Sequence, residues 1–206
     1  MTCSAFAYET ASESPAPGGG SISAYMGALA AALGTMVANL SAHKPGWDEE
    51  WEQFSNAAEE GQALLKELLA LVDEDTDAFN MIMAALKMSK STPEDITLRN
   101  EALQSATLYA TEVPLRTMLA AFRVFPLLKA MAESGNPNSV SDAGVGALAA
   151  RRAVLGARLN VRINASGLDD RNRAQALIEE AEVIACKAVE AEAEVLSIAE
   201  RKIQWH

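Results

Sequence analysis

The sequence predicts an all-α protein, a bundle of about six helices with long central ones, and composition and hydrophobic spacing both support this. Alanine dominates the hydrophobic half of the 206 residues, and aromatic residues make up only 5%. Alanine is the best helix former, whereas aromatic and β-branched residues favour strands. Apolar residues recur three and four positions apart over long stretches, and no segment alternates as a strand does. We therefore expect residues 1–206 to form one helical domain.

The first half predicts one short helix and two longer ones. The short helix covers residues 3–12 and ends at the turn-forming segment 14–21, Ser-Pro-Ala-Pro-Gly-Gly-Gly-Ser. The second covers residues 21–42 and ends at residues 43–46, His-Lys-Pro-Gly, because Pro-Gly does not continue a helix. A long, acidic, amphipathic helix then covers residues 48–87. Its apolar stripe contains Leu64, Leu68, Leu71, Ala78, Ile82 and Leu86.

A loop at residues 89–92 precedes a helix with a strong start signal. Thr92 is the expected N-cap, Pro93 fits the first helical position, and Asp95 completes a capping box. The helix is expected to reach residue 132. It contains two prolines that should kink or break it, Pro114 and Pro126.

The last third predicts two further helices. Residues 139–142, Ser-Val-Ser-Asp, form a second candidate capping box after the loop 134–138, and this helix continues to Asn164 before Gly167. The final helix covers residues 169–202. Its apolar residues alternate steps of four and three, and they are Leu177, Ala181, Ile184, Ala188, Ala191, Val195 and Ile198. Such a heptad seam packs against another helix, either in this chain or in a second copy.

Charge and cysteine content narrow the class of protein. The net charge of −11 argues against nucleic-acid binding, although a local basic cluster could still hold a small anion. Cys3 and Cys186 are far apart and match no metal spacing, which suggests a reducing compartment without disulfides. The N-terminus lacks the basic start and apolar run of a signal peptide, so we expect a cytoplasmic protein.

One segment has the length of a membrane span. Residues 22–42 carry no charged side chain, and about 20 apolar residues cross a bilayer. The segment is built from Ala, Gly, Ser and Thr, which insert weakly, and no basic residue precedes it to set an orientation. A buried helix is the preferred interpretation, because small residues let neighbouring backbones approach closely.

The acidic run at residues 73–77, Asp-Glu-Asp-Thr-Asp, has some of the carboxylates that a calcium loop needs. That loop needs Gly at its sixth position and Glu at its twelfth, and counting from Asp73 these positions hold Ala78 and Ala84. The run therefore fits no calcium site. No other metal-binding pattern was found, and we expect no bound metal.

Helical geometry instead separates Asp75 from its acidic neighbours. Asp75 lies four residues after Leu71 and four before Phe79, within the apolar stripe, whereas Asp73 and Asp77 lie about 200° away on the solvent side. Burial among apolar side chains raises the pKa of a carboxyl, as a proton shuttle near neutral pH requires. The alternative is structural: Asp75 pairs with an arginine or caps a neighbouring helix.

The glycines at positions 18–20 and Ser21 enter the second helix. Free backbone amides at a helix start bind anions or carbonyl oxygens. Neither the phosphate-binding loop nor the dinucleotide fingerprint fits, because no Lys-Ser/Thr follows and no strand precedes. The alternative is a sharp turn that lets the helix pack closely.

Gly156, Asn160 and Asn164 follow one another at steps of four and share one face of their helix. Two amides beside a glycine can bind a flat, hydrogen-bonding heterocycle, or they can satisfy a helix end or a buried loop.

Arg151, Arg158 and Arg162 mark another face, which is more typical of a solvated surface than of an anion site. His43 and His206 are isolated, so a mechanism centred on histidine is not expected.

Three stretches together resemble a known family. They are residues 15–24 (Pro-Ala-Pro-Gly-Gly-Gly-Ser-Ile-Ser-Ala) leading to Met36-Val-Ala-Asn, residues 72–79 (Val-Asp-Glu-Asp-Thr-Asp-Ala-Phe) followed by Lys90 and Thr92-Pro-Glu, and residues 135–148 (Gly-Asn-Pro-Asn-Ser-Val-Ser-Asp-Ala-Gly-Val-Gly-Ala-Leu). Their order and spacing resemble the cyclodeaminase domain of formiminotransferase-cyclodeaminase and the related methenyltetrahydrofolate cyclohydrolases.

The resemblance implies a helical homodimer, a tetrahydrofolate derivative as substrate and one-carbon carrier, and a catalytic role for Asp75. We expect residues 18–21 and 138–142 to line the pocket, and Lys90 or Arg99 to hold the glutamate tail of the folate. The predicted substrate-binding residues are Gly18, Gly19, Gly20, Ser21, Lys90, Arg99, Asn138, Ser141, Asp142, Asn160 and Asn164.

The expected activity is that of a formimidoyltetrahydrofolate cyclodeaminase, which closes 5-formimino-tetrahydrofolate to the 5,10-methenyl form and releases ammonia. Methenyltetrahydrofolate cyclohydrolase is the nearest alternative, and a non-catalytic helical assembly module is another. In fused members of the family a transferase domain precedes this one. The chain would then be a fragment of such an enzyme or would receive its substrate from a separate glutamate formiminotransferase.

Overall fold

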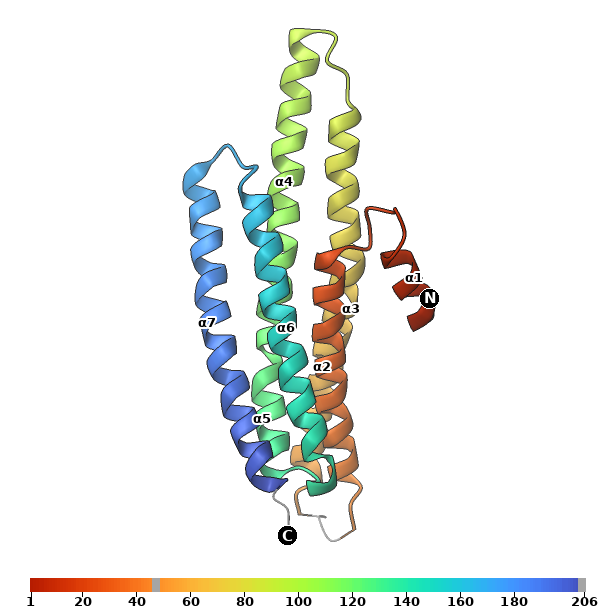
Figure 1. Cartoon of the computed structure of the whole chain (residues 1–206), viewed down its shortest axis with the longest axis vertical. Helices are drawn as coiled ribbons and strands as arrows, with labels where there is room; N and C mark the ends of the chain where they lie inside the picture. Colours follow the sequence, from red (N-terminus) through yellow and green to blue (C-terminus); the bar gives the residue numbers. More distant parts are fainter. Residues whose placement is uncertain (46–48, 204–206) are drawn as a thin grey trace.

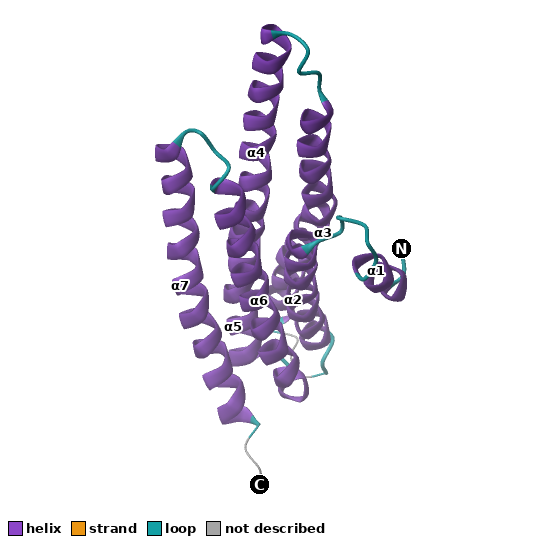
Figure 2. Cartoon of the chain, turned by 45° about the horizontal axis from the view of Figure 1, so that its top comes forward, coloured by secondary structure: helices purple, strands orange, loops and turns teal. Residues whose placement is uncertain are grey.

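A computed structural model describes residues 1–45 and 49–203 as an up-and-down helical bundle (Figures 1 and 2). The long helices run alternately in opposite directions, and α5 continues the direction of α4. The elements are α1 (Cys3–Thr10), α2 (Gly19–Ala42), α3 (Trp51–Lys87), α4 (Pro93–Phe122), α5 (Val124–Ser134), the 3₁₀ helix η1 (Pro137–Ser139), α6 (Val140–Ala165) and α7 (Arg171–Lys202). The described residues contain no strand, and the predicted all-α bundle is confirmed.

Helix α2 packs between α3 and α6. Small residues allow this close approach: a Cβ atom at Gly27 would lie 2.9 Å from a methyl carbon of Leu68, and one at Gly156 would lie 2.4 Å from the hydroxyl of Ser23. By length and composition α2 could cross a membrane, but 61% of its apolar window is buried inside the bundle. The burial agrees with the predicted role of this helix in close packing.

The heptad seam of α7 faces its own chain. Leu177, Ala181, Ile184 and Val195 are all buried, and α7 packs mainly on α6. The arginine row of α6 also faces α7, where Arg151 pairs with Glu192 at 2.8 Å. Arg158 and Arg162 both approach Glu182, at 2.9 and 3.7 Å. The row is thus neither a free solvated face nor an open anion site.

The prolines behave differently from the prediction. Pro114 lies inside α4, which continues through it to Phe122, and the chain breaks at Arg123 instead. Pro126 does not cause a break, because it lies in the first turn of α5, where the missing N–H has no intrahelical partner to lose. The carbonyl of Ala110, which Pro114 leaves without its helical donor, accepts a hydrogen bond from Asn164 Nδ2 at 2.6 Å. This side-chain bond replaces the missing backbone bond.

One predicted capping box is confirmed and the other is wrong. Thr92 accepts from the backbone of Asp95 while the Asp95 carboxylate accepts from the backbone of Thr92. Ser139 makes no capping bond, because its ψ of 12° is far from the extended conformation of an N-cap. The chain enters α6 through η1, where Asn136 accepts from the backbone of Asn138 at 3.1 Å.

Several predicted boundaries shift by a few residues. The first helix ends at Thr10 rather than at residue 12, α2 begins at Gly19 rather than at residue 21, and α7 begins two residues later than expected. The predicted start of the long acidic helix at Asp48, the helix stop at Gly46, and His206 all lie outside the described residues.

Candidate active site

The first turn of α2 forms one wall of the candidate site. Gly18 is the N-cap residue and supplies no side chain to the free amides of the turn. Gly20 and Ser21 are buried in this turn, against α3. The first turn of α2 therefore has backbone donors without a capping side chain of their own and needs an acceptor from elsewhere.

Asp75 of α3 supplies that acceptor. The Ser21 hydroxyl donates to Asp75 Oδ2 at 2.8 Å. A Cβ atom at Gly20 would lie 2.0 Å from Asp75 Oδ1, so only glycine leaves room for the carboxyl at this turn. The carboxyl takes the place of the missing N-cap side chain of α2. The glycines at 18–20 and the acid of the apolar stripe, which the sequence analysis treats separately, are therefore in contact. The alternative prediction that Asp75 caps a neighbouring helix is also correct, because its carboxyl accepts from Ser21 in the first turn of α2.

Burial among apolar side chains raises the pKa of Asp75 above its usual range. The Ser21 hydroxyl and the Ser21 backbone amide favour the ionised form and oppose this rise without cancelling it. Asp73 and Asp77 are exposed, as the helical geometry predicts. The three aspartates of this run are thus distinguished by their environments, and Asp75 alone faces the interior.

Asp75 lines a small cavity of about 160 Å³, which we call the Asp75 cavity. Its lining comes from the 15–20 segment, α3, α4 and α6. The lining residues are Pro15, Ala16, Gly18, Gly19, Gly20, Asp75, Ala78, Phe79, Ile82, Ala110, Asn160 and Asn164. The cavity combines apolar walls with a few polar groups, as small-molecule sites do.

Both asparagine side chains that line this cavity are held by hydrogen bonds to backbone carbonyls. Asn160 Nδ2 donates to the carbonyl of Gly156 at 3.1 Å, and Asn164 Nδ2 donates to the carbonyl of Ala110 at 2.6 Å. Beyond these bonds each amide keeps its Oδ1 acceptor and one N–H donor. Together with the Asp75 carboxyl, the two amides give the cavity polar groups that can bind a hydrogen-bonding ligand.

The remaining predicted site residues lie away from the cavity in this chain. Asn138, Ser141 and Asp142 lie at the opposite end of α6, and about 27 Å of helix separates residue 142 from Asn160. Lys90 and Arg99 lie at the tip of the α3–α4 hairpin, which projects beyond the bundle (Figure 1). Arg99 Nε donates there to the carbonyl of Leu86 at 3.4 Å.

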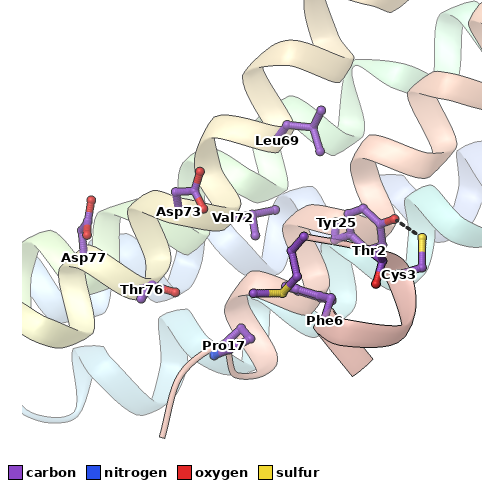
Figure 3. Close-up of a pocket in the computed structure, with 11 residues that line it drawn as sticks. Thr2, Cys3, Phe6, Pro17, Tyr25, Leu69, Val72, Asp73, Thr76 and Asp77 are labelled. Carbon is purple, nitrogen blue, oxygen red and sulfur yellow. Dashed lines mark hydrogen bonds between the residues drawn. The ribbon is translucent and has the colours of Figure 1, made fainter. Parts of the chain in front are cut away.

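A second, larger pocket was not predicted from the sequence. This α1 pocket has a volume of about 600 Å³ and lies between the N-terminal helix and the bundle (Figure 3). The rings of Phe6 and Tyr25 lie 5.4 Å apart in its wall. The lining residues are Met1, Thr2, Cys3, Phe6, Pro17, Tyr25, Leu69, Val72, Asp73, Thr76 and Asp77. The only sequence signal for this pocket is the pair of aromatic residues Phe6 and Tyr25. Because they are 19 positions apart and belong to different helices, the sequence does not indicate that they meet.

Residues 1–45 and 49–203 contain no group of three or more His, Cys, Asp or Glu side chains arranged to hold a metal. Cys3 and Cys186 are both free and exposed.

Comparison with known proteins assigns the chain that carries this site to a family. The formiminotransferase-cyclodeaminase family model matches residues 2–183. The chain belongs to the formiminotransferase-cyclodeaminase family. It is therefore related to enzymes that interconvert folate derivatives, and the family resemblance of the three sequence stretches is confirmed.

Two relatives and one solved structure illustrate the range of this family. A methenyltetrahydrofolate cyclohydrolase from Methylorubrum extorquens is 38% identical over 86% of each chain. A formimidoyltransferase-cyclodeaminase from Rattus norvegicus is 35% identical over 86% of this chain, but the match spans only 34% of the rat protein. A crystal structure of formiminotetrahydrofolate cyclodeaminase from Thermotoga maritima superposes with a TM-score of 0.87 at 26% identity, covering 99% of this chain and 98% of that one.

Gly20→Ala should destabilise the protein by about 1–3 kcal/mol, because the added methyl group collides with the Asp75 carboxyl. Gly19→Ala is the matched control: its Cβ would meet its nearest neighbour at 3.7 Å, an ordinary contact, and alanine favours a helix. Urea unfolding of both variants measures the difference. Equal free energies of unfolding for Gly20→Ala and Gly19→Ala would contradict the close contact between Asp75 and Gly20.

The stability of the protein should also depend on Asp75 and pH. Because the pKa of Asp75 is raised by burial, the folded protein holds this proton more tightly than the unfolded chain. The resulting stabilisation is full below the ordinary carboxyl pKa of about 4 and is lost as the pH rises through the raised pKa. As the pH rises through this range, the free energy of unfolding of the wild type should fall relative to that of Asp75→Asn, as urea unfolding at several pH values measures. If the free energies of unfolding of the two proteins change in parallel with pH, the pKa of Asp75 is not raised in the folded protein.

Proposed function

We propose that the protein is a formimidoyltetrahydrofolate cyclodeaminase with Asp75 as its proton-transfer residue. The observation that carries this proposal is that the Asp75 carboxyl and the amides of Asn160 and Asn164 line one small cavity. A formimino group carries an N–H donor that can pair with the carboxyl or with an amide oxygen, and the departing nitrogen needs a proton.

The proposed reaction depends on geometry and proton transfer. N10 of the folate attacks the formimino carbon on N5, ammonia leaves, and the 5,10-methenyl bridge closes. Holding N5 and N10 in register makes this ring closure effectively unimolecular. Asp75, with a pKa raised by burial, takes the N10 proton and gives a proton to the leaving nitrogen in turn.

Methenyltetrahydrofolate cyclohydrolase is the second candidate, and one observation favours it. The relative from Methylorubrum extorquens carries that activity in its name and matches 86% of each chain, whereas the rat relative is far longer. In this reaction Asp75 would remove a proton from the water that attacks the bridging carbon.

Asp75→Asn should lower turnover by roughly two to four orders of magnitude and leave the helical fold intact, because the amide cannot shuttle protons. Parallel assays of ammonia release from 5-formimino-tetrahydrofolate and of methenyl hydrolysis measure the effect and identify the reaction. An exposed acid elsewhere on α3, Glu60→Gln, is the control and should retain activity. Undiminished turnover in Asp75→Asn would remove Asp75 from the mechanism.

We further propose that the protein forms a homodimer through the outer face of α2 and α6. This face exposes Leu29, Met36, Leu148 and Leu159, and α2 contributes no charged side chain to it. Large exposed apolar patches mark interfaces. A second copy of a chain with a net charge of −11 would be repelled little along this face, because α2 carries no charged side chain there and the exposed Arg152 of α6 is positive.

Leu148→Glu should convert the dimer into monomers, because it places a charge in the apolar contact. Val183→Glu on α7, a similarly exposed apolar residue outside this face, is the control and should leave the dimer intact. Light scattering coupled to size-exclusion chromatography measures the mass of each variant. A wild-type monomer, or a dimer that survives Leu148→Glu, would rule out this interface.

A further inference from the structure

We propose that Asp75, Ser21 and Thr76 form a hydroxyl relay between the Asp75 cavity and the α1 pocket. The relay lets the carboxyl exchange protons with solvent while substrate fills the cavity. This inference rests on the proposed function, because a relay acts only if Asp75 transfers protons during turnover.

Two hydroxyl groups lead from the carboxyl to the α1 pocket. The Ser21 hydroxyl donates to Asp75 Oδ2 at 2.8 Å, and Ser21 Oγ lies 3.5 Å from Thr76 Oγ1. Asp75 lines the Asp75 cavity, Thr76 lines the α1 pocket (Figure 3), and Ser21 is fully buried between them. The three side chains therefore link two separate pockets through one short path. The Ser21–Thr76 step is the longer one and should limit the rate of transfer.

The hydroxyl of Thr76 is held differently from those of other helical threonines. Thr107, Thr111 and Thr117 each donate to the carbonyl four residues earlier in α4, at 2.7, 2.8 and 3.2 Å. Helical threonines commonly make this bond. The hydroxyl of Thr76 instead contacts Ser21 on α2 across the α3–α2 interface, at 3.5 Å. Its hydroxyl is thus directed toward the group that holds the catalytic carboxyl.

The α1 pocket suits the solvent end of a relay. Asp73 and Asp77 belong to its lining, and both are exposed on α3 beside Thr76 (Figure 3). Two negative charges at the pocket raise the local concentration of hydronium and cationic buffer acids. The Asp75 cavity has about a quarter of the volume of the α1 pocket. A bound folate would therefore fill the Asp75 cavity and separate Asp75 from water on that side.

Each transfer through the relay conserves protons. Inward, Ser21 passes its proton to Asp75 Oδ2 and takes the proton of Thr76. A buffer acid or hydronium in the α1 pocket then supplies a new proton to Thr76 Oγ1. The net result is one proton moved from the pocket onto the carboxylate, and the outward direction reverses every step.

Both candidate reactions need such exchange with solvent. Cyclodeamination of a neutral formimino group takes up two protons, because it forms a methenyl cation and an ammonium ion. Hydrolysis of the methenyl cation by water forms a neutral formyl group and releases one proton. While substrate or product covers the cavity, the carboxyl beneath it can exchange these protons with solvent only through a second route.

The test replaces the hydroxyl of Thr76 by a methyl group of the same shape, Thr76→Val, with Thr76→Ser as the matched control. In dilute buffer Thr76→Val should lower kcat between about 10- and 100-fold and leave KM unchanged, because the substrate does not contact Thr76. In a second variant, Thr76→Ala, the space beside Ser21 opens as the hydroxyl is lost, and imidazole at increasing concentration and constant ionic strength should restore the rate through the α1 pocket. Thr76→Ser should keep most of the wild-type kcat.

A Thr76→Val enzyme with the wild-type kcat in dilute buffer, or a Thr76→Ala enzyme that imidazole does not rescue, would overturn the relay alone. A wild-type protein without folate turnover would overturn the proposed function and the relay with it. The wild type and Asp75→Asn are therefore assayed first, with thermal unfolding of each variant to verify its fold.

Discussion

The contact between the Asp75 carboxyl and the first turn of α2 is the constraint on which the site depends. Ser21 donates to the carboxylate, Gly20 leaves room for it, and Gly18 provides no competing cap. The same contact joins α2 to α3, fixes the carboxyl at the cavity, and places it where burial raises its pKa. Structure and chemistry are inseparable here, because the group that completes a helix end is also the group that can carry a proton.

Much of the fold follows from the sequence, because helix periodicity and local start signals are short-range properties. The Thr92 capping box and the buried stripe of α3 from Leu64 to Ala78 were both predictable in this way, but Leu86, predicted at the end of that stripe, is exposed where α3 projects beyond the bundle. The break at Arg123 and the uncapped start of α6 were not, because packing and the preceding 3₁₀ turn decide them. Pro114 remained helical because a side chain 50 residues away in sequence satisfied the carbonyl that it exposed.

The candidate site was predictable only in part. Asp75 stood out because helical spacing placed an acid among apolar residues, and the glycines stood out by their chemistry. Their meeting, and the addition of two asparagines from α6, required tertiary structure. The distance of Asn138 and Lys90 from the cavity could not be foreseen, because a sequence motif carries no information on which end of a long helix faces which neighbour.

The proline in α4 has a consequence for ligand selection. Its imide nitrogen leaves one peptide oxygen, that of Ala110, available to a partner outside the helix, and Asn164 occupies it through its amino hydrogens. The bond fixes the orientation of the Asn164 amide, because rotation by half a turn would set two oxygens against each other. A residue that does not line the cavity thus determines how one of its lining side chains is held.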